Sequence, residues 1–384
     1  MSYYPARAVV DHAAIRANVS RLREAAGPAD VMAVVKADAY GHGLVPVART
    51  ALAAGATWLG VAQLAEALAL RAAGVGAPLL TWIYGPGAPL DEALTADLDL
   101  SASAPWALAE IAAAARATGR TARVHLKIDT GMARGGATAA DWQALVVSAA
   151  RLRAEGVLNV VGIWSHLARA DEPGHPATAA QVAVFTDAVE RAERAGLRPH
   201  VRHLAASSAT LTAPATHFDL VRPGLALYGL SPVPAVASAA ALGLRPAMRL
   251  EADVVLVKDV PAGTPVSYGH TYATSGPTRL AVVPLGYGDG IPRHASSAGG
   301  VQVAGRRALV AGRVCMDQVT LDLGSPDVPV AAGDVAVLFG DGSAGEPTAQ
   351  DWAEAAGTIS YEIVTRLGER VPRVHVGAEE EDGR

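Results

Sequence analysis

A lysine that follows an uninterrupted apolar run is the first residue of this sequence that could do chemistry. Five apolar residues, 31–35, precede Lys36, and a Gly-His-Gly turn follows at 41–43. Such a run predicts a strand buried on both faces, with Lys36 at the carboxyl end, where α/β folds keep their catalytic groups. A lysine amine in apolar surroundings has a lowered pKa and becomes a nucleophile. A lysine that merely ends a strand and reaches solvent would give the same pattern.

Other polar residues follow apolar runs of the same kind further along the chain. They are Tyr40 after the first run, Asp129 and Arg134 after the fifth, His166 after the sixth, Ser207 after the seventh, and Arg222 with Gly224 around the eighth. This set contains no carboxylate pair and no His/Asp/Glu cluster at metal-ligand spacing. Neither glycosidase chemistry nor a metal site is therefore expected.

Small residues after the last two runs favour a phosphate site. The stretches 205–209 and 222–225 offer a hydroxyl, Ser207, and a glycine, Gly224, that lets backbone N–H groups approach a ligand closely. Loops at this place in (β/α)8 barrels often bind phosphate. A phosphate site beside the amine of Lys36 indicates pyridoxal 5'-phosphate, bound covalently to the lysine. A class I aldolase would share both features, and the spacing alone does not separate the two.

The elements that must position these residues alternate regularly. Eight strand-like runs are expected at 31–36, 58–62, 78–83, 98–103, 122–129, 157–166, 203–207 and 221–229. Segments with helical spacing lie between most of them, at 44–54, 63–73, 106–117, 139–154 and 178–195, and a short strand and a helix precede them at 8–10 and 12–26. Eight strands alternating with helices predict an α/β fold of the (β/α)8 TIM-type barrel class. A doubly wound open sheet is the alternative, which the strand count and the lack of a Gly-x-Gly-x-x-Gly motif disfavour.

A second domain is expected after a proline-rich break at 231–235. Short alternating runs punctuated by glycine and proline follow it, at 252–258, 278–283, 301–303, 307–310 and 335–339, with one helix at 349–356. This texture predicts a mainly antiparallel β domain. We therefore place the barrel at 1–235 and the β domain at 236–384, with the acidic stretch 379–382 as a disordered terminus.

The composition argues against several classes of partner. The 384 residues carry a formal net charge of −5, and the basic residues are scattered, so neither nucleic acid nor an anionic membrane surface is expected as a partner. No apolar stretch of about 18 residues predicts a membrane span, and the N-terminus lacks the apolar core of a secretion signal. The single cysteine, Cys315, excludes an internal disulfide and is typical of a reducing compartment. We expect a soluble cytoplasmic protein.

Six blocks of the sequence resemble the bacterial alanine racemase family, in the family's order. They are 33–43, 127–134, 164–166, 218–224, 266–269 and 312–317, the first of which is similar to the family's cofactor-lysine signature. The resemblance implies a (β/α)8 barrel followed by a mainly β domain, in a homodimer with shared active sites. It also implies the pyridoxal phosphate-dependent interconversion of L-alanine and D-alanine, which supplies D-alanine for peptidoglycan.

The same resemblance implies roles for individual residues. Lys36 would carry the cofactor and act as the base on one face of the substrate carbon, while Tyr268 of the other subunit would be the base on the opposite face. His203 would link Tyr268 to Arg222, which would contact the pyridine nitrogen. Further cofactor contacts would come from Tyr40, Ser207, Tyr361, Gly224 and Leu225 at the phosphate, from Arg134 at the phenolic oxygen, and from His166. The substrate would meet Arg134, Met316, Tyr268 and Tyr287, supported by Lys127, Cys315 and Asp317; Lys127 is carbamylated in some relatives.

One departure from the family pattern concerns the cofactor. Ala206 stands where most relatives have asparagine, and an alanine cannot hydrogen-bond the cofactor's phenolic oxygen. A broader amino-acid racemase, a barrel-type decarboxylase and a cofactor carrier without chemistry are the alternative functions. Arg222 in place of an acid argues against the decarboxylase, and a β domain with Tyr268 argues against a single-barrel carrier.

Overall fold

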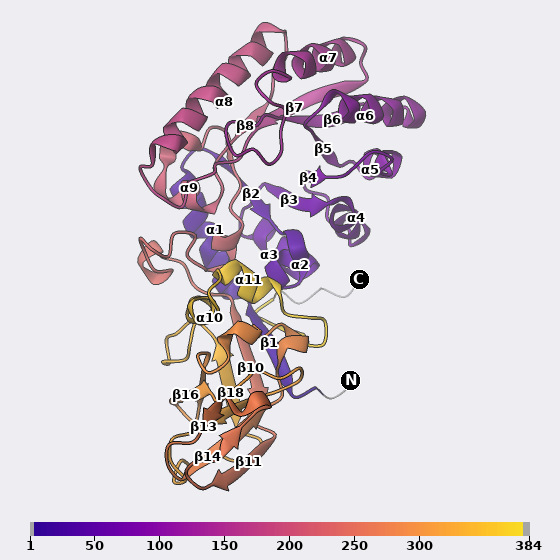
Figure 1. The fold of residues 1–384 in the computed structure, drawn as a ribbon. Helices are drawn as coiled ribbons and strands as arrows, with labels where there is room; N and C mark the ends of the chain where they lie inside the picture. The colour runs from indigo at the N-terminus through magenta and orange to yellow at the C-terminus, as the bar shows by residue number, and fades with distance from the viewer. Residues whose placement is uncertain (1–3, 379–384) are drawn as a thin grey trace.

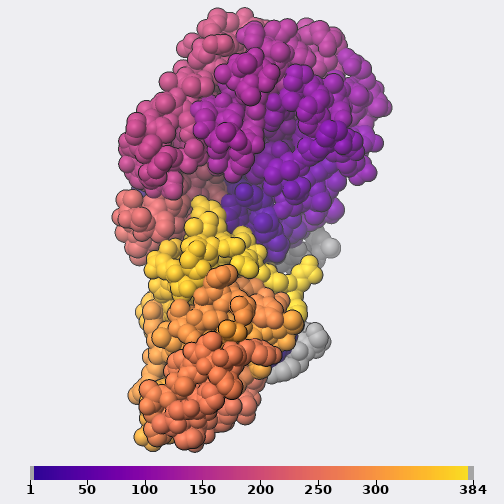
Figure 2. All heavy atoms as spheres, in the orientation of Figure 1, coloured from indigo at the N-terminus to yellow at the C-terminus, as the bar shows by residue number. Residues whose placement is uncertain are grey.

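The computed structural model describes residues 4–378, and across them the strands form two large sheets in two lobes. Figure 1 shows the upper lobe as a ring of strands with helices outside it and the lower lobe as a twisted sheet. The space-filling view shows an elongated body in which the last helices, in yellow, lie at the junction of the lobes (Figure 2).

The upper lobe is the predicted barrel. Its strands are β2 (Asp30–Val34), β3 (Trp58–Gln63), β4 (Leu79–Ile83), β5 (Asp99–Ala102), β6 (Ala122–Lys127), β7 (Leu158–Trp164), β8 (Val201–His203) and β9 (Leu220–Val221). Within the described residues they form one sheet in the order β8-β7-β6-β5-β4-β3-β2-β9, with every neighbouring pair parallel. The ring closes where Arg222 N donates to Ala205 O at 2.8 Å and Asp219 N donates to Arg202 O at 3.1 Å. The predicted fold class is confirmed.

Helices cover the strands of this lobe, and the longer ones each bury an apolar face. The helices are α1 (His12–Ala26), α3 (Leu44–Ala53), α4 (Leu64–Ala72), α5 (Leu90–Thr95), α6 (Pro105–Thr118), α7 (Trp142–Ala154), α8 (Pro176–Arg194) and α9 (Ser207–Thr212). The sequence of α1 explains its formation. Ile15, Val19 and Leu22 recur at helical spacing and are fully buried. The Asp11 side chain caps the first turn. The short helix α5 was not expected from the sequence.

The last two barrel strands are shorter than predicted. The run 203–207 was expected to be a strand, but β8 ends at His203 and α9 begins at Ser207; the run 221–229 was expected to continue to Gly229, but β9 ends at Val221. Pro223 has no N–H for a sheet, and the N–H groups of Gly224 and Ala226 donate to the Ser207 hydroxyl instead. A tertiary contact between the two loops therefore replaces strand pairing.

The lower lobe is mainly antiparallel, as predicted. Its nine-stranded sheet, within residues 4–378, has the order β11-β14-β17-β16-β15-β18-β10-β1-β19. The strands are β1 (Ala6–Asp11), β10 (Met248–Asp253), β11 (Leu256–Val260), β14 (Thr278–Val283), β15 (Gly300–Val303), β16 (Arg306–Val310), β17 (Val319–Asp322), β18 (Val335–Phe339) and β19 (Arg373–Val376), beside a small sheet of β12 (Pro265–Val266) and β13 (Tyr272–Ala273). Its helices are α10 (Ala349–Ala356) and α11 (Ser360–Thr365). Single 3-10 turns lie in the barrel at Pro214–Thr216 and Leu225–Tyr228, and after it at Ala240–Leu242, Tyr268–His270, Tyr287–Asp289 and Arg293–Ala295.

The first strand corrects the predicted domain division. β1 pairs antiparallel with β10 and parallel with β19, so residues 6–11 belong to the β sheet and not to the barrel. Its alternating residues Ala6, Ala8 and Val10 are fully buried, which is the pattern of a strand with one face on a core. Apart from this strand, the boundary at 235 remains a prediction, and the acidic stretch 379–382 lies outside the described residues.

Candidate active site

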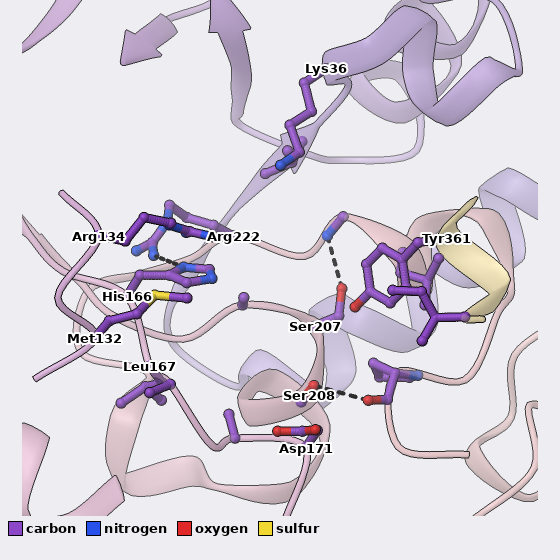
Figure 3. A pocket seen from close by; sticks show the side chains of 18 of the residues that line it. Lys36, Met132, Arg134, His166, Leu167, Asp171, Ser207, Ser208, Arg222 and Tyr361 are labelled. Carbon is purple, nitrogen blue, oxygen red and sulfur yellow. Dashed lines mark hydrogen bonds between the residues drawn. The ribbon is translucent and has the colours of Figure 1, made fainter. Parts of the chain in front are cut away.

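Lys36 lies at the mouth of the barrel, at the start of an unusual turn. The segment α2 (Lys36–Gly41) contains four consecutive residues, 37–40, with φ between 52° and 54°. The left-handed region costs a non-glycine residue roughly 1–2 kcal/mol. Glu66 opposes this cost because its carboxylate accepts from Ala37 N at 2.5 Å, and Arg373 donates to Gly41 O at 2.9 Å. The turn is thus held from the barrel and from the β domain, and it points the Lys36 side chain into the pocket (Figure 3).

The amine of Lys36 is conditioned by its surroundings. Burial lowers its pKa, the positive charge of Arg134 lowers it further, and Glu66 opposes both. A lowered pKa increases the fraction of neutral amine, which is the nucleophilic form. The structure therefore supports the chemistry expected of this lysine.

A second corner of the pocket is lined by hydroxyl groups and backbone N–H groups. Ser207 Oγ accepts from Gly224 N at 2.9 Å and from Ala226 N at 3.2 Å, and the rings of Tyr40 and Tyr361 lie beside each other with centroids 6.2 Å apart. A Cβ atom at Gly224 would lie 2.2 Å from Tyr40 Oη, so a side chain there would fill the corner. Figure 3 shows Ser207 and Tyr361 together on this wall. Such a corner fits a phosphate group.

The opposite wall carries positive charge. Lys127 Nζ lies 4.2 Å and Arg222 Cζ lies 4.9 Å from the ring centroid of Trp164. Burial, then Arg222 and Arg134, lowers the pKa of Lys127 to about 8. Burial and then Arg222 lower the pKa of His166 to about 3, so this imidazole is neutral. Arg134 lies on a loop shaped by Asp129, whose carboxylate accepts from three successive backbone N–H groups.

Arg222 is the most buried of these cations, at 4% exposure. Its guanidinium donates to Ser165 O at 2.7 Å and to Leu204 O at 3.1 Å, and it approaches His203 Nδ1 at 3.2 Å and His166 Nδ1 at 3.4 Å. Burial lowers its pKa to about 9, which leaves it charged at neutral pH. The side chain is fixed by four contacts before any ligand binds.

These walls enclose one cavity of about 1010 Å³. Its lining includes ten residues that sequence reasoning named, namely Lys36, Tyr40, Lys127, Arg134, His166, Ser207, Arg222, Gly224, Leu225 and Tyr361. The departure at Ala206 also lies on this lining. In the part of the chain that the structure describes, no group of three or more His, Cys, Asp or Glu residues could hold a metal ion.

The other predicted site residues form a separate group on the β domain. The lining of the cavity, among residues 4–378, does not include Tyr268, Tyr287, Cys315, Met316 or Asp317. Tyr287 N donates to Cys315 O at 2.9 Å, and Gly288 N donates to Met316 O at 2.8 Å, so two of the loops lie together. Tyr268, Met316 and Tyr287 are 71%, 53% and 44% exposed. One chain therefore carries a group of site residues around the cavity and a separate, exposed group on the β domain.

One predicted contact is wrong. His203 was expected to link Tyr268 to Arg222, but it is fully buried and both its ring nitrogens are occupied. Its Nδ1 lies 3.2 Å from the Arg222 guanidinium, and its Nε2 lies 2.9 Å from His125 Nδ1. No nitrogen is left for a tyrosine. His166, which lines the cavity and faces Arg222, is the histidine that a ligand or a partner residue could reach.

Sequence reasoning missed two residues that shape the site. Trp164 lies beneath Lys127 and Arg222, and Glu66 holds the turn after Lys36. The signal for Glu66 was weak: it ends a Gln63-to-Glu66 capping box, which predicts a helix start and says nothing of a contact 29 residues away. Trp164 stands directly before Ser165 and His166 in a block already recognised.

Among residues 4–378, no helix has both the length and the apolar character that crossing a membrane requires.

Comparison with known proteins now identifies the family. The sequence model of the alanine racemase N-terminal domain matches residues 10–232, and that of the alanine racemase C-terminal domain matches residues 247–375. An alanine racemase of Beutenbergia cavernae is 66% identical over 374 residues, which are 97% of this chain and 98% of that protein. The crystal structure of alanine racemase from D-cycloserine-producing Streptomyces lavendulae covers 99% of both chains with a TM-score of 0.97 and 55% identity, and that from Streptomyces coelicolor covers 97% and 98% with a TM-score of 0.95 and 59% identity. The chain belongs to the alanine racemase family.

Proposed function

We propose that this chain is a pyridoxal 5'-phosphate-dependent alanine racemase that interconverts L-alanine and D-alanine and supplies D-alanine for peptidoglycan. The observation that carries the proposal is the pairing of a desolvated amine, Lys36, with a phosphate-type corner at Ser207 and Gly224 in one cavity. The identity to alanine racemases over almost the whole chain gives the reaction.

The residues of the cavity fit the cofactor group by group. Lys36 would hold it covalently, and Tyr40, Ser207, Tyr361 and the backbone of Gly224 and Leu225 would hold its phosphate. Arg222 would face the pyridine nitrogen, and Arg134 would contact the phenolic oxygen and the substrate carboxylate. When bound, the cofactor withdraws electrons from the α-carbon of the amino acid and so acidifies its proton.

Racemisation needs a proton to leave one face of the carbon and another to arrive at the opposite face. We assign the first face to Lys36 and the second to Tyr268 of a partner subunit in a homodimer. The exposure of Tyr268 and its absence from the cavity lining of its own chain, within residues 4–378, support this crossed arrangement. His166, and not His203, would then connect the partner's tyrosine to Arg222. Met316 and Tyr287 of the partner would bind the substrate carboxylate and narrow the entrance.

Lys127 would act as an anion after carbamylation. With a pKa near 8 far more of its amine is neutral at neutral pH than in an ordinary lysine, and a neutral amine adds to carbon dioxide with loss of a proton. The resulting carbamate would lie between Arg134 and Arg222 and would orient Arg134. This orientation would matter because Ala206, unlike asparagine, has no side-chain group to hydrogen-bond the cofactor's phenolic oxygen beside Arg134.

We also propose a cytoplasmic location, since the single cysteine, Cys315, is free.

The test is proton exchange at the α-carbon in deuterated water, with purified protein and added pyridoxal phosphate. Deuterium should enter from both enantiomers while optical rotation decays to zero, with no carbon dioxide or keto acid formed. No exchange from either enantiomer, despite a cofactor absorbance band that Lys36→Ala removes, would mean that the cofactor site is real and alanine is the wrong substrate; serine, lysine and arginine would be tested next.

A further inference from the structure

A buried hydrogen-bonded chain runs through the barrel interior behind the active site. It begins at Arg222 and passes through His203 on β8 and His125 on β6 to Asp99 at the start of β5. His203 and His125 are fully buried, and Asp99 is 1% exposed. The links are Arg222 to His203 Nδ1 at 3.2 Å, His203 Nε2 to His125 Nδ1 at 2.9 Å, and His125 Nε2 to Asp99 Oδ2 at 3.2 Å.

The chemistry of these groups fixes the direction of every link. Arg222 has donors only, so His203 Nδ1 must accept, and the single proton of that imidazole is on Nε2. His203 Nε2–H therefore donates to His125 Nδ1, which leaves the proton of His125 on Nε2. That N–H donates to the Asp99 carboxylate, which accepts only. A neutral tautomer is required of both histidines, and each tautomer is set by its neighbours in the chain.

The barrel is built around this arrangement. Trp164 stacks on His203 with ring planes 1° apart and centroids 5.6 Å apart, and Trp58 meets His125 edge-on at 5.5 Å. Gly162, on the strand between β6 and β8, has an ordinary backbone conformation, but a Cβ atom there would lie 2.3 Å from His125 Nδ1. A glycine at this position is what allows the two imidazoles to meet across β7.

The hydrogen-bonded series also connects Arg222 to a negative charge, the carboxylate of Asp99. The guanidinium's own contacts are two carbonyl groups and two neutral imidazoles, whereas a buried cation is stabilised best by an anion. Asp99 supplies one at a distance, because its carboxylate polarises His125 and, through it, makes His203 Nδ1 a stronger acceptor. Burial raises the pKa of Asp99, but His125 and Arg123 lower it below the usual value, so the carboxylate is charged.

We propose that Asp99 and His125 are positioning residues of the racemase reaction: they fix the tautomer of His203 and thereby hold the Arg222 guanidinium in place behind the cofactor. The catalytic part of this inference rests on the proposed function, whereas the tautomers do not. The competing explanation is that Asp99 serves only as the ion-pair partner of Arg123, whose Nε lies 2.5 Å from Asp99 Oδ1.

Three variants separate the two explanations. Asp99→Asn removes the charge and replaces one of the two oxygens that accept from Arg123 and His125 with an NH2 group, which cannot accept. Gly162→Ala displaces the His125 ring but removes no ionisable group. Arg123→Gln is the matched control, since it breaks the ion pair and leaves the chain to Arg222 intact.

The first measurement is the nitrogen NMR spectrum of histidine-labelled protein without cofactor, with His203 and His125 assigned by their own substitutions. We expect both to show an unprotonated Nδ1 and a protonated Nε2 in the wild type and in Arg123→Gln. Asp99→Asn and Gly162→Ala should lose this single-tautomer pattern at His203. An unchanged pattern in both variants would overturn the inference.

The second measurement is kcat and KM for alanine with cofactor bound. Asp99→Asn and Gly162→Ala should lower kcat roughly 10- to 100-fold, the usual loss on removing a partner that orients a functional histidine, with KM little changed. Arg123→Gln should keep the wild-type kcat. Equal losses in Asp99→Asn and Arg123→Gln would show that the ion pair is what matters and would overturn the inference, and if Asp99→Asn does not fold, Gly162→Ala decides. A wild type with the expected tautomers and no racemisation would instead overturn the proposed function, and with it the catalytic role.

Discussion

The predicted site residues at the barrel mouth and those on the β-domain loops differ in their exposure to solvent. At the mouth, Lys36, Lys127 and Arg222 are wholly or partly withdrawn from water, and burial is the largest cause of the lowered pKa of each. On the β domain, Tyr268 and Met316 are more than half exposed, so their side chains are open to contact with another surface. The cavity residues are positioned by contacts within one chain, whereas the exposed residues of the β domain do not line that cavity of their own chain within residues 4–378. A second copy of the chain, placed so that each exposed group meets the other's cavity, would complete both.

The largest effect we expect comes from separating the two halves by mutation. Lys36→Ala and Tyr268→Ala homodimers should each lose racemase activity by at least about 10⁴-fold, a loss typical of groups that take part in the chemical step. After the two are dissociated, mixed in equal amounts and reassembled, half of the dimers are mixed and each has one intact site. The mixture should therefore recover about one quarter of the wild-type activity.

The control for this experiment is each parent taken through the same mixing alone, which should recover nothing. If verified mixed dimers stay inactive, both bases come from one chain, and the idea that Tyr268 completes the cavity of the other subunit is wrong.

A smaller effect should come from Tyr268→Phe, which keeps the ring and removes the acid–base group. We expect racemisation to fall roughly 10²- to 10⁴-fold, the range for general acid–base catalysis. Deuterium exchange should persist from one enantiomer only, since Lys36 still serves its own face. Proton NMR of each enantiomer in deuterated water measures this, and equal residual exchange from both would argue against a two-base mechanism.

The contrast between the halves also explains what the sequence could predict. The barrel strands were predictable because strands buried on both faces give continuous apolar runs, and Lys36 ends the clearest of them. The ends of β8 and β9 were not, because Ser207 and Gly224 bond to each other across 17 residues in place of strand pairing. The pairing of His125 with His203, 78 residues apart, was equally invisible and made the expected link from His203 to Tyr268 wrong. Residues of the exposed group were named through family resemblance alone, and their roles remain predictions.

Lys127 offers a test of the cationic wall through stability. If its amine is free, its folded pKa of about 8 lies below the unfolded value of 10.5, so the unfolded chain binds more protons between these pH values. The unfolding free energy should then rise with pH from about 8 to 10.5, and Lys127→Met should be more stable at neutral pH by on the order of 1–3 kcal/mol. If Lys127 is carbamylated, Lys127→Met removes an anion from between two arginines and should be less stable than the wild type.

We expect Lys127 to be carbamylated when carbon dioxide is present and to have a free amine when it is absent, so the buffer decides which stability order is observed. In bicarbonate buffer the wild type should be the more stable protein and roughly tenfold the more active, and in carbon dioxide-free buffer the order of stability should reverse. Chemical denaturation of both proteins in the two buffers measures this, with native mass spectrometry to detect the added group. If the unfolding free energy of the wild type is the same in both buffers, Lys127 does not form a carbamate.

The smallest effect should come from one ion pair that supports the exposed half. Arg370 contacts two carboxylates, the fully buried Asp289 at 2.7 Å and the exposed Asp317 at 2.9 Å. Asp289 also accepts from Gly286 N at 2.9 Å and so shapes the turn that carries Tyr287. Because exposed ion pairs contribute about 0.2–1 kcal/mol, Asp317→Asn should raise KM for alanine by no more than roughly fivefold and leave kcat unchanged. Asp289→Asn, which strips a buried acceptor of its charge, is the matched comparison and should raise KM further. Steady-state kinetics of the two variants checks the order, and a greater loss in Asp317→Asn would mean that its carboxylate acts on the substrate site directly and not through Arg370.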